Sequence, residues 1–172
     1  PTAQFGLNVF EGVKAYYSKK LDKKYIFRLD DHIKRLYSSC KLMRIQPTHS
    51  LDEIRKIISE LIIINKYRED VSFRITFYVY DEGSWSASSP VGLFIAPIES
   101  QRKSLSDSIS KTATISSYQR ISDHNMSPRI KTGANYIAGR YAHLLANELN
   151  YDLPIFLNDQ SFVSEGAGAC IF

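Results

Sequence analysis

The stretch Lys131-Thr-Gly-Ala-Asn-Tyr136 is the segment from which the rest of this 172-residue sequence is best interpreted. Its lysine precedes a glycine and an alanine, and residues 135–150 then show the apolar spacing of an amphipathic helix. A turn made of such small residues lets a bulky planar group lie against the backbone. A single lysine is most often an ordinary surface residue, so the meaning of Lys131 depends on the segments around it.

About thirty residues further on, the chain reads Ser164-Glu-Gly-Ala-Gly168. This segment follows a predicted hairpin in which residues 155–157 and 161–163 flank an Asn-Asp-Gln turn. Its two glycines resemble the start of a phosphate-binding loop, but the third glycine and the following Lys-Ser/Thr of such loops are missing. Taken alone, Glu165 is interpreted as a solvated carboxylate on a turn.

The first hundred residues alternate between predicted strands and predicted helices. Clusters of β-branched and aromatic residues indicate four strands, at residues 13–17, 24–29, 71–80 and 91–98. A helix is expected at residues 31–44, capped by an aspartate at 30 or 31 and carrying Arg35. The capping-box pattern Ser50-x-x-Glu53 starts a second helix. This alternation predicts a small α/β unit.

The composition changes after residue 98. Residues 99–110 are polar and predict a linker, and a strand is expected beyond it at residues 112–118. We therefore expect an α+β fold, with a small N-terminal α/β domain at residues 1–98, the linker, and the first part of a larger domain at residues 111–172. The sequence has no initial methionine and ends in an apolar run that predicts a strand, so we expect a fragment of a longer protein.

Charge and composition argue against several classes of function. The net charge is +4, but basic residues are scattered among acidic ones, which disfavours nucleic-acid binding. No apolar run is long enough to span a bilayer. The four histidines lack ligand spacing, so no metal site is predicted. Cys40 and Cys170 do not make a disulfide framework, and reduced thiols favour the cytoplasm.

Three parts of the chain resemble the fold-type IV enzymes that use pyridoxal 5'-phosphate (PLP). Val9-Phe-Glu-Gly-Val-Lys-Ala-Tyr16 resembles their early glycine segment, and Phe27-Arg-Leu-Asp-Asp-His-Ile-Lys-Arg-Leu36 resembles their next strand and helix. Lys131 to Tyr136, followed by Ser164 to Gly168, resembles the cofactor-binding segments of the branched-chain aminotransferases. The segments occur in the family's order and cover nearly the whole chain. The resemblance implies that the larger domain is barrel-like.

The resemblance also implies which residues bind the cofactor. Lys131 would carry PLP as a Schiff base and would then act as the catalytic acid and base. Arg35 would bind the phosphate, because a permanently charged donor fork suits that group. Tyr136 would hydrogen-bond the phenolic oxygen of PLP. Glu165 would face the pyridine nitrogen, since a carboxylate there favours the protonated ring.

By the same resemblance, Phe10 would line the substrate pocket and Arg74 would receive the side-chain carboxylate of glutamate. The implied reaction moves an amino group between a branched-chain or related apolar L-amino acid and 2-oxoglutarate, in a homodimer with its sites near the domain interface. Four departures from the family pattern bear on the substrate rather than the cofactor. Phe5 and Ser72 stand where the family commonly has tyrosines, Ala169-Cys170 stands where it usually has Glu-Asn, and residues 99–105 lack an aromatic residue that is often found there.

Two alternatives stay open at this point. The first is another enzyme of the same fold, either a D-amino-acid aminotransferase or an aminodeoxychorismate lyase. The second is a non-catalytic domain in which Lys131 is merely structural. The small residues between Lys131 and Tyr136 favour the branched-chain type.

Overall fold

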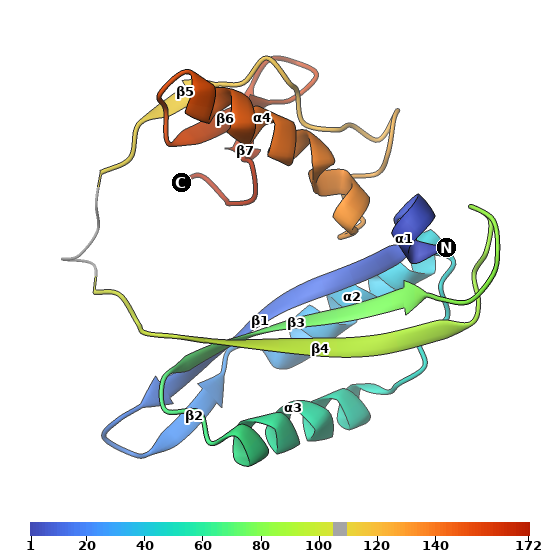
Figure 1. Cartoon of the computed structure of the whole chain (residues 1–172), viewed down its shortest axis with the longest axis vertical. Coiled ribbons are helices and arrows are strands. Elements are labelled where there is room, and N and C mark those ends of the chain that lie inside the picture. Colours follow the sequence, from blue (N-terminus) through green and yellow to red (C-terminus); the bar gives the residue numbers. More distant parts are fainter. Residues whose placement is uncertain (105–109) are drawn as a thin grey trace. The chain divides into compact units, whose positions relative to one another are not determined.

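The computed structural model describes residues 1–104 and 110–172 (Figure 1). Within it the chain divides into two compact units. Unit 1 comprises Pro1–Ser104 and also takes in Ile130–Thr132, and unit 2 comprises Leu105–Arg129 and Gly133–Phe172. Each unit contains a sheet of its own.

Unit 1 is built on a four-stranded antiparallel sheet with the strand order β2-β1-β3-β4 (Figure 1). A short helix precedes the sheet, and the elements are α1 (Thr2–Phe5), β1 (Asn8–Ser18), β2 (Lys23–Ile26), β3 (Asp70–Val79) and β4 (Val91–Ser100). The long pairing of β1 with β3 runs from Asn8 opposite Tyr78 to Ala15 opposite Val71. The two middle strands carry the residues predicted to bind substrate, Phe10 on β1 and Arg74 on β3.

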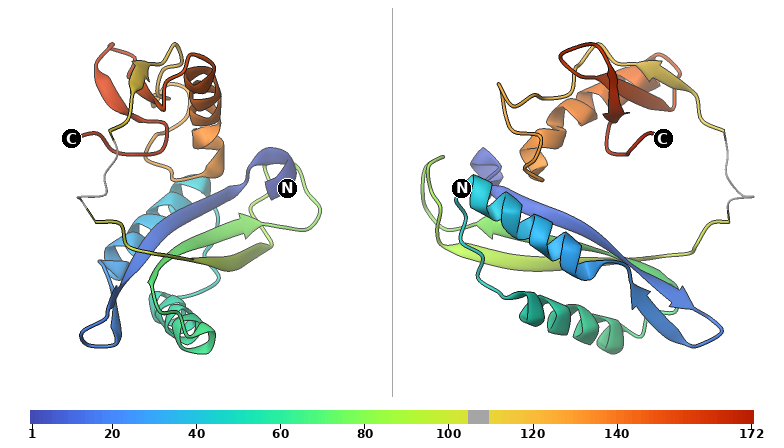
Figure 2. Two further views of the ribbon diagram at one scale, coloured as in Figure 1. Left: turned by 60° about the vertical axis from the view of Figure 1, so that its left-hand side comes forward. Right: turned by 180° about the vertical axis from the view of Figure 1, so that it is seen from behind.

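Two helices, α2 (Leu29–Met43) and α3 (Leu51–Asn65), pack against this sheet. The right-hand view of Figure 2 shows α2 lying along the strands. The apolar stripes of both helices meet alternate strand residues in one core, which includes Val9, Val13, Ile33, Leu36, Ile54, Ile58, Phe73, Ile75 and Phe77. Burying each large apolar side chain stabilises the fold by roughly 1.5–3 kcal/mol.

The sheet of unit 1 has two different faces because successive strand residues point in opposite directions. On β1, Val9 and Val13 are buried beneath the helices, and the acidic Glu11 lies in the same row. Phe10 belongs to the opposite face, and so does Arg74 of β3. Glu11 of β1 therefore faces the helices, whereas its neighbour Phe10 faces the opposite side of the sheet.

The helix starts in unit 1 confirm one local signal and contradict another. At the start of α3, Ser50 and Glu53 form both hydrogen bonds of the predicted capping box. Helix α2 begins at Leu29, after a left-handed Arg28 with φ 51°, and the expected aspartate cap is wrong. Leu29 packs against the core as the first helical residue instead of extending the preceding strand, so tertiary packing overrides the local cap signal.

The linker predicted at residues 99–110 starts too early, because its first two residues belong to β4. Strand β4 continues to Ser100 because it stays paired with β3, whose Asp70 lies opposite Ser100. Residues 105–109 of the predicted linker lie outside the described residues.

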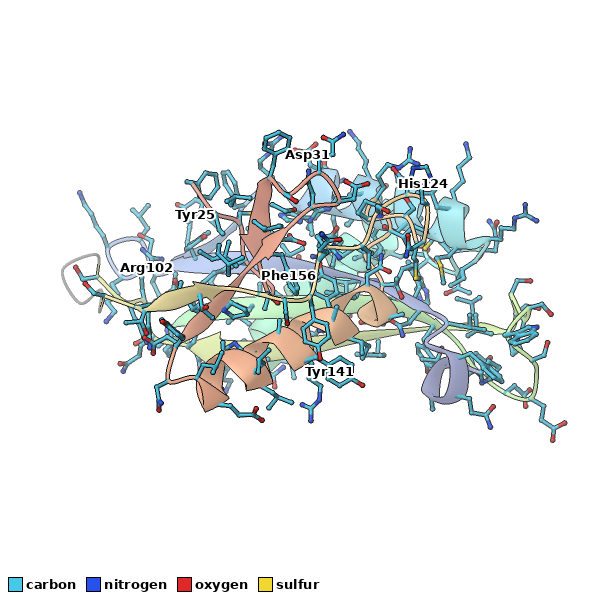
Figure 3. The ribbon with its side chains drawn as sticks, turned by 90° about the horizontal axis from the view of Figure 1, so that it is seen from above. Tyr25, Asp31, Arg102, His124, Tyr141 and Phe156 are labelled. Atoms are coloured by element: carbon cyan, nitrogen blue, oxygen red, sulfur yellow. The ribbon has the colours of Figure 1, made fainter. Side chains whose placement is uncertain are left out.

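Unit 2 contains a three-stranded sheet with the order β5-β6-β7. Its elements are β5 (Ala113–Ile115), a 3-10 turn η2 (Gly133–Tyr136), α4 (Ile137–Glu148), β6 (Leu153–Leu157) and β7 (Val163–Gly166). Strand β6 pairs parallel to β5 and antiparallel to β7. Phe156 of β6 is 3% exposed and lies close to α4. Figure 3 labels Phe156 together with Tyr141, which is a residue of α4.

Two strand predictions in unit 2 need correction. The strand expected at residues 112–118 is limited to Ala113–Ile115, where the chain pairs with β6. The apolar residues 169–172 are not in a strand, because the chain turns there and Gly166 N–H donates to the Ala169 carbonyl at 2.9 Å. The predicted hairpin is present as β6 and β7, but its second strand is Val163–Gly166 rather than residues 161–163, so Glu165 lies within that strand instead of on a turn.

Two features of the described residues bear on broad classes of function. No helix there is both long enough and apolar enough to cross a membrane. No group of three or more His, Cys, Asp or Glu side chains is arranged there to hold a metal ion.

Candidate active site

Lys131 is fastened to unit 1 through its backbone, although it is distant from that unit's strands in sequence. Its N–H donates to Ser39 Oγ of α2 at 3.1 Å, and its carbonyl accepts from Phe10 N–H of β1 at 2.8 Å. Ser39 is fully buried, so this anchor lies within the folded structure rather than on a loose loop. The position of Lys131 is thus set by a strand and a helix together.

The ring of Phe10 lies close to the side chains of both Lys131 and Arg74. Its Nζ is 5.0 Å from the centre of the Phe10 ring. The guanidinium carbon of Arg74 is 3.7 Å from the same ring centre. Arg74 lies opposite Gly12 in the β1–β3 pairing, and that glycine presents no side chain on this face. The structure therefore brings Phe10, Arg74 and Lys131 together.

Arg35 lies on α2 and contacts Glu11, whose side chain is on the helix-facing side of β1. Glu11 accepts hydrogen bonds from Arg35 Nε and, at 2.7 Å, from Arg35 Nη2. His32, one turn earlier on the helix, places its Nδ1 3.0 Å from the same carboxylate. Glu11 is 0% exposed, whereas the Arg35 side chain is 56% exposed. Arg35, the residue predicted to bind the cofactor phosphate, is therefore held in place by the buried carboxylate of Glu11.

Sequence reasoning missed Glu11 and His32. The sequence did contain a signal for Glu11. It is the one acidic residue among the alternate positions of β1 that face the core, and the others are Val9, Val13 and Ala15. A charge in such a row needs a partner, since unpaired buried charges are strongly unfavourable. The partner could not be named without knowing which helix covers the strand.

Tyr136 and Glu165 lie in unit 2, where a second arginine joins them. Arg120 forms an ion pair with Glu165 of β7. Its Nη1 donates to the Asn135 carbonyl at 3.1 Å, and its guanidinium carbon is 5.9 Å from the Tyr136 ring centre. The Arg120 side chain is 15% exposed, so it is a mostly buried part of this cluster. Sequence reasoning did not identify it.

An open pocket of about 490 Å³ adjoins this cluster within unit 2. Its lining includes Arg120, Ser164 and Glu165, together with His124 and Asp159. The pocket places the Glu165 carboxylate at the border of a space large enough for a small organic molecule.

The side chains of both units fit the chemistry of PLP. Lys131 offers an amine for a carbonyl group and Arg35 offers a guanidinium for a phosphate. Glu165 offers a carboxylate for a ring nitrogen, and Tyr136 offers a phenol for a phenolic oxygen. Four of the six predicted residues belong to unit 1, and the other two belong to unit 2.

A family model described as amino-transferase class IV matches residues 8–172. The match takes in both units and all six residues assigned from the sequence. The chain therefore belongs to the class IV aminotransferase family. The expected α+β fold of the fold-type IV enzymes is confirmed for the part of that fold which this chain spans.

Similar proteins are branched-chain aminotransferases. The probable branched-chain-amino-acid aminotransferase of Aquifex aeolicus (strain VF5) is 28% identical over 172 residues, covering 98% of this chain and 54% of that protein. The branched-chain amino acid aminotransferase from Thermobaculum terrenum in its PLP form has a TM-score of 0.85 and 32% identity, covering 98% of this chain and 55% of that one. The branched-chain aminotransferase from Thermoproteus uzoniensis with norvaline has a TM-score of 0.82 and 27% identity, covering 98% and 56%. This chain thus spans about half the length of the relatives it matches.

Proposed function

We propose that the protein is a PLP-dependent aminotransferase that moves an amino group between a branched-chain or related apolar L-amino acid and 2-oxoglutarate. The observation that carries this proposal is the position of Lys131, which β1 and α2 hold beside Phe10, the ring on which Arg74 also packs. Membership of the class IV aminotransferases and the likeness to branched-chain enzymes support it.

Four residues would hold the cofactor. Lys131 binds it covalently through the side-chain amine, and Arg35 binds its phosphate. Tyr136 donates a hydrogen bond to its phenolic oxygen, and Glu165 accepts one from its ring nitrogen. When bound, PLP supplies an electron sink for the bond that breaks at the α-carbon of the substrate.

Lys131 would have a second task once its side-chain amine is free of the cofactor. Its amine would take the proton from the substrate α-carbon as a general base, and would give that proton back as a general acid to complete a 1,3-proton shift. The two backbone hydrogen bonds of Lys131 keep the root of this side chain in place while the amine end moves. Its proximity to Phe10 keeps the amine beside an apolar surface.

The substrate would lie against Phe10 and Arg74. The ring of Phe10 offers an apolar surface to a branched side chain. Arg74 packs on that ring and offers a cation for the side-chain carboxylate of glutamate or 2-oxoglutarate. One surface thus accepts both an apolar and an acidic substrate in the two halves of a ping-pong reaction.

We further propose that unit 1 is the small N-terminal domain of this enzyme class and that unit 2 is the beginning of its large PLP-binding domain. We also propose a homodimer in the cytoplasm, with no nucleic-acid or membrane partner. The free cysteines Cys40 and Cys170 and the scattered charges are compatible with this assignment.

The decisive experiment uses the protein as its gene encodes it, purified with added PLP. A visible absorption band should appear, and borohydride reduction followed by mass spectrometry should locate the cofactor on Lys131. Lys131→Ala should abolish both the band and the activity. Lys56→Ala, which changes an exposed lysine of α3, should alter neither. A band that survives Lys131→Ala would overturn the proposal.

Substrate assays separate the related activities. Amino-group transfer from L-leucine to 2-oxoglutarate is expected. Transfer from D-alanine instead would point to a D-amino-acid aminotransferase, and release of pyruvate from aminodeoxychorismate would point to a lyase. If the protein binds PLP and turns over none of the three, the proposed substrate class is wrong and the cofactor assignment stands.

A further inference from the structure

Glu11 is a buried carboxylate in a row of apolar side chains. It lies between Val9 and Val13 on the helix-facing side of β1 and is 0% exposed. Two side chains of α2, Arg35 and His32, pair with it. Replacing a buried ion pair by apolar residues of similar volume is often neutral or stabilising. Stability alone therefore gives little reason for a charge at this position.

The pairing fixes the direction of the Arg35 guanidinium. The two oxygens of Glu11 bind Nε and Nη2, so the planar group is held along one edge. The anion is fully buried while its cation is 56% exposed. A cation immobilised in this way loses less conformational entropy when it binds a ligand.

The same two elements also hold the backbone of Lys131. Phe10, directly before Glu11, donates its N–H to the Lys131 carbonyl. Ser39, one helical turn after Arg35, accepts from the Lys131 N–H. The Glu11–Arg35 pair therefore joins β1 to α2 next to the place where both elements bond Lys131.

We propose that Glu11 is a positioning residue for the cofactor phosphate. It holds Arg35 by Nε and Nη2 so that the guanidinium is oriented to bind the phosphate of PLP, and His32 contacts the same carboxylate from the same helix. This inference rests on the proposed function, in which Arg35 binds that phosphate.

The test compares PLP with pyridoxal, which lacks the phosphate. Each is titrated into cofactor-free protein, as the gene encodes it, and binding is followed by absorbance. Glu11→Gln should weaken PLP binding by at least about tenfold, the equivalent of losing one charge-assisted hydrogen bond. Its affinity for pyridoxal should stay close to the wild-type value. A purely structural role would weaken both ligands equally, and that result would overturn the inference.

Asp70→Asn provides a matched control, because Asp70 is a carboxylate of the same sheet, 2% exposed and paired with Arg102 through two hydrogen bonds. This variant should leave the ratio of PLP to pyridoxal affinity unchanged. Glu11→Asp keeps the charge but shortens the side chain, and it should show a smaller loss selective for PLP. It serves as the test variant if Glu11→Gln does not fold.

Arg35→Gln separates this inference from the proposed function. If Arg35→Gln binds PLP as tightly as wild type, the phosphate role of Arg35 is wrong and the proposed function loses that assignment. If Arg35→Gln shows a selective loss and neither Glu11 variant does, only the role of Glu11 is overturned.

Discussion

Arg120 and Glu165 form an ion pair in unit 2 that is shielded from solvent, with the arginine 15% and the glutamate 31% exposed. Arg120 comes from the loop after β5 and Glu165 from β7, so the pair joins two segments 45 residues apart in sequence. Through its bond to the Asn135 carbonyl, the same arginine also reaches the turn that carries Tyr136. One guanidinium thus organises both residues assigned to the cofactor in this unit.

Arg120→Met should lower the free energy of unfolding by about 2 kcal/mol, because Glu165 and the Asn135 carbonyl each lose a charged partner in a partly buried place. Urea unfolding measures the loss. Arg129→Met is the control, since Arg129 pairs with Asp123 on the surface at 71% and 56% exposure, and it should cost less than about 1 kcal/mol. Equal losses in the two variants would show that shielding does not strengthen the Arg120 pair.

Gly139 of α4 lies against the segment that follows Glu165. A Cβ at this position would come within 2.5 Å of the Ala167 carbonyl oxygen, which belongs to the backbone and cannot easily move. Gly139→Ala should therefore destabilise the protein by about 1–2 kcal/mol, although alanine favours helices by about 1 kcal/mol. Gly168→Ala meets nothing within 4 Å and should be close to neutral. Thermal unfolding of both variants tests the contact, and a more stable Gly139→Ala protein would contradict it.

Thr76 of β3 is 4% exposed, and its hydroxyl has no hydrogen-bond partner among the described residues. Thr76→Val should raise the free energy of unfolding by up to about 1 kcal/mol, because valine keeps the shape and removes an unsatisfied polar group. Thr132 is equally buried, but its hydroxyl donates to the Gly6 carbonyl at 3.4 Å. Thr132→Val should therefore lower stability by about 1 kcal/mol. Opposite signs in urea titrations are expected, and the same sign would refute the distinction.

Asp152 introduces a pH dependence into the stability of unit 2. Its carboxylate accepts from Thr112 N–H at 2.8 Å and pairs with Lys111, and these bonds lower the pKa of Asp152 from 3.8 to about 2. Because the folded pKa lies below the unfolded value, the stabilisation is present above pH 3.8 and is lost as the pH falls toward 2. Asp152→Asn should be less stable than wild type at pH 5 and should show a flatter decline below pH 4. Unfolding free energies measured across this range check the slope, and parallel curves would contradict the assignment.

Local signals predicted most of the secondary structure of unit 1. The capping box of Ser50 and Glu53 depends on atoms three residues apart, so it forms wherever the helix forms. The alternation along β3 reports which face is buried, and it predicted that strand to within one residue at each end. The start of α2 was predicted less well, because the packing of Leu29 outweighs the capping preference of the two aspartates that follow it.

The candidate site was predictable in its parts and not in its connections. The segment around Lys131 and the one around Glu165 could be recognised by their residue types and spacing. Nothing in a single sequence shows that Lys131 bonds Phe10 and Ser39, which lie 121 and 92 positions away. Arg120 was missed for the same reason, since its importance comes from the carboxylate it meets.

The sequence by itself determined most of the local elements of unit 1 and the segments that place the chain among the class IV aminotransferases. Both depend on residues close together in the chain, where the backbone limits the possible arrangements. Only the tertiary structure decided which charges meet, such as Glu11 with Arg35 and Arg120 with Glu165. Those pairs depend on strand register and on which helix covers which face, and these are set by the packing of the whole core.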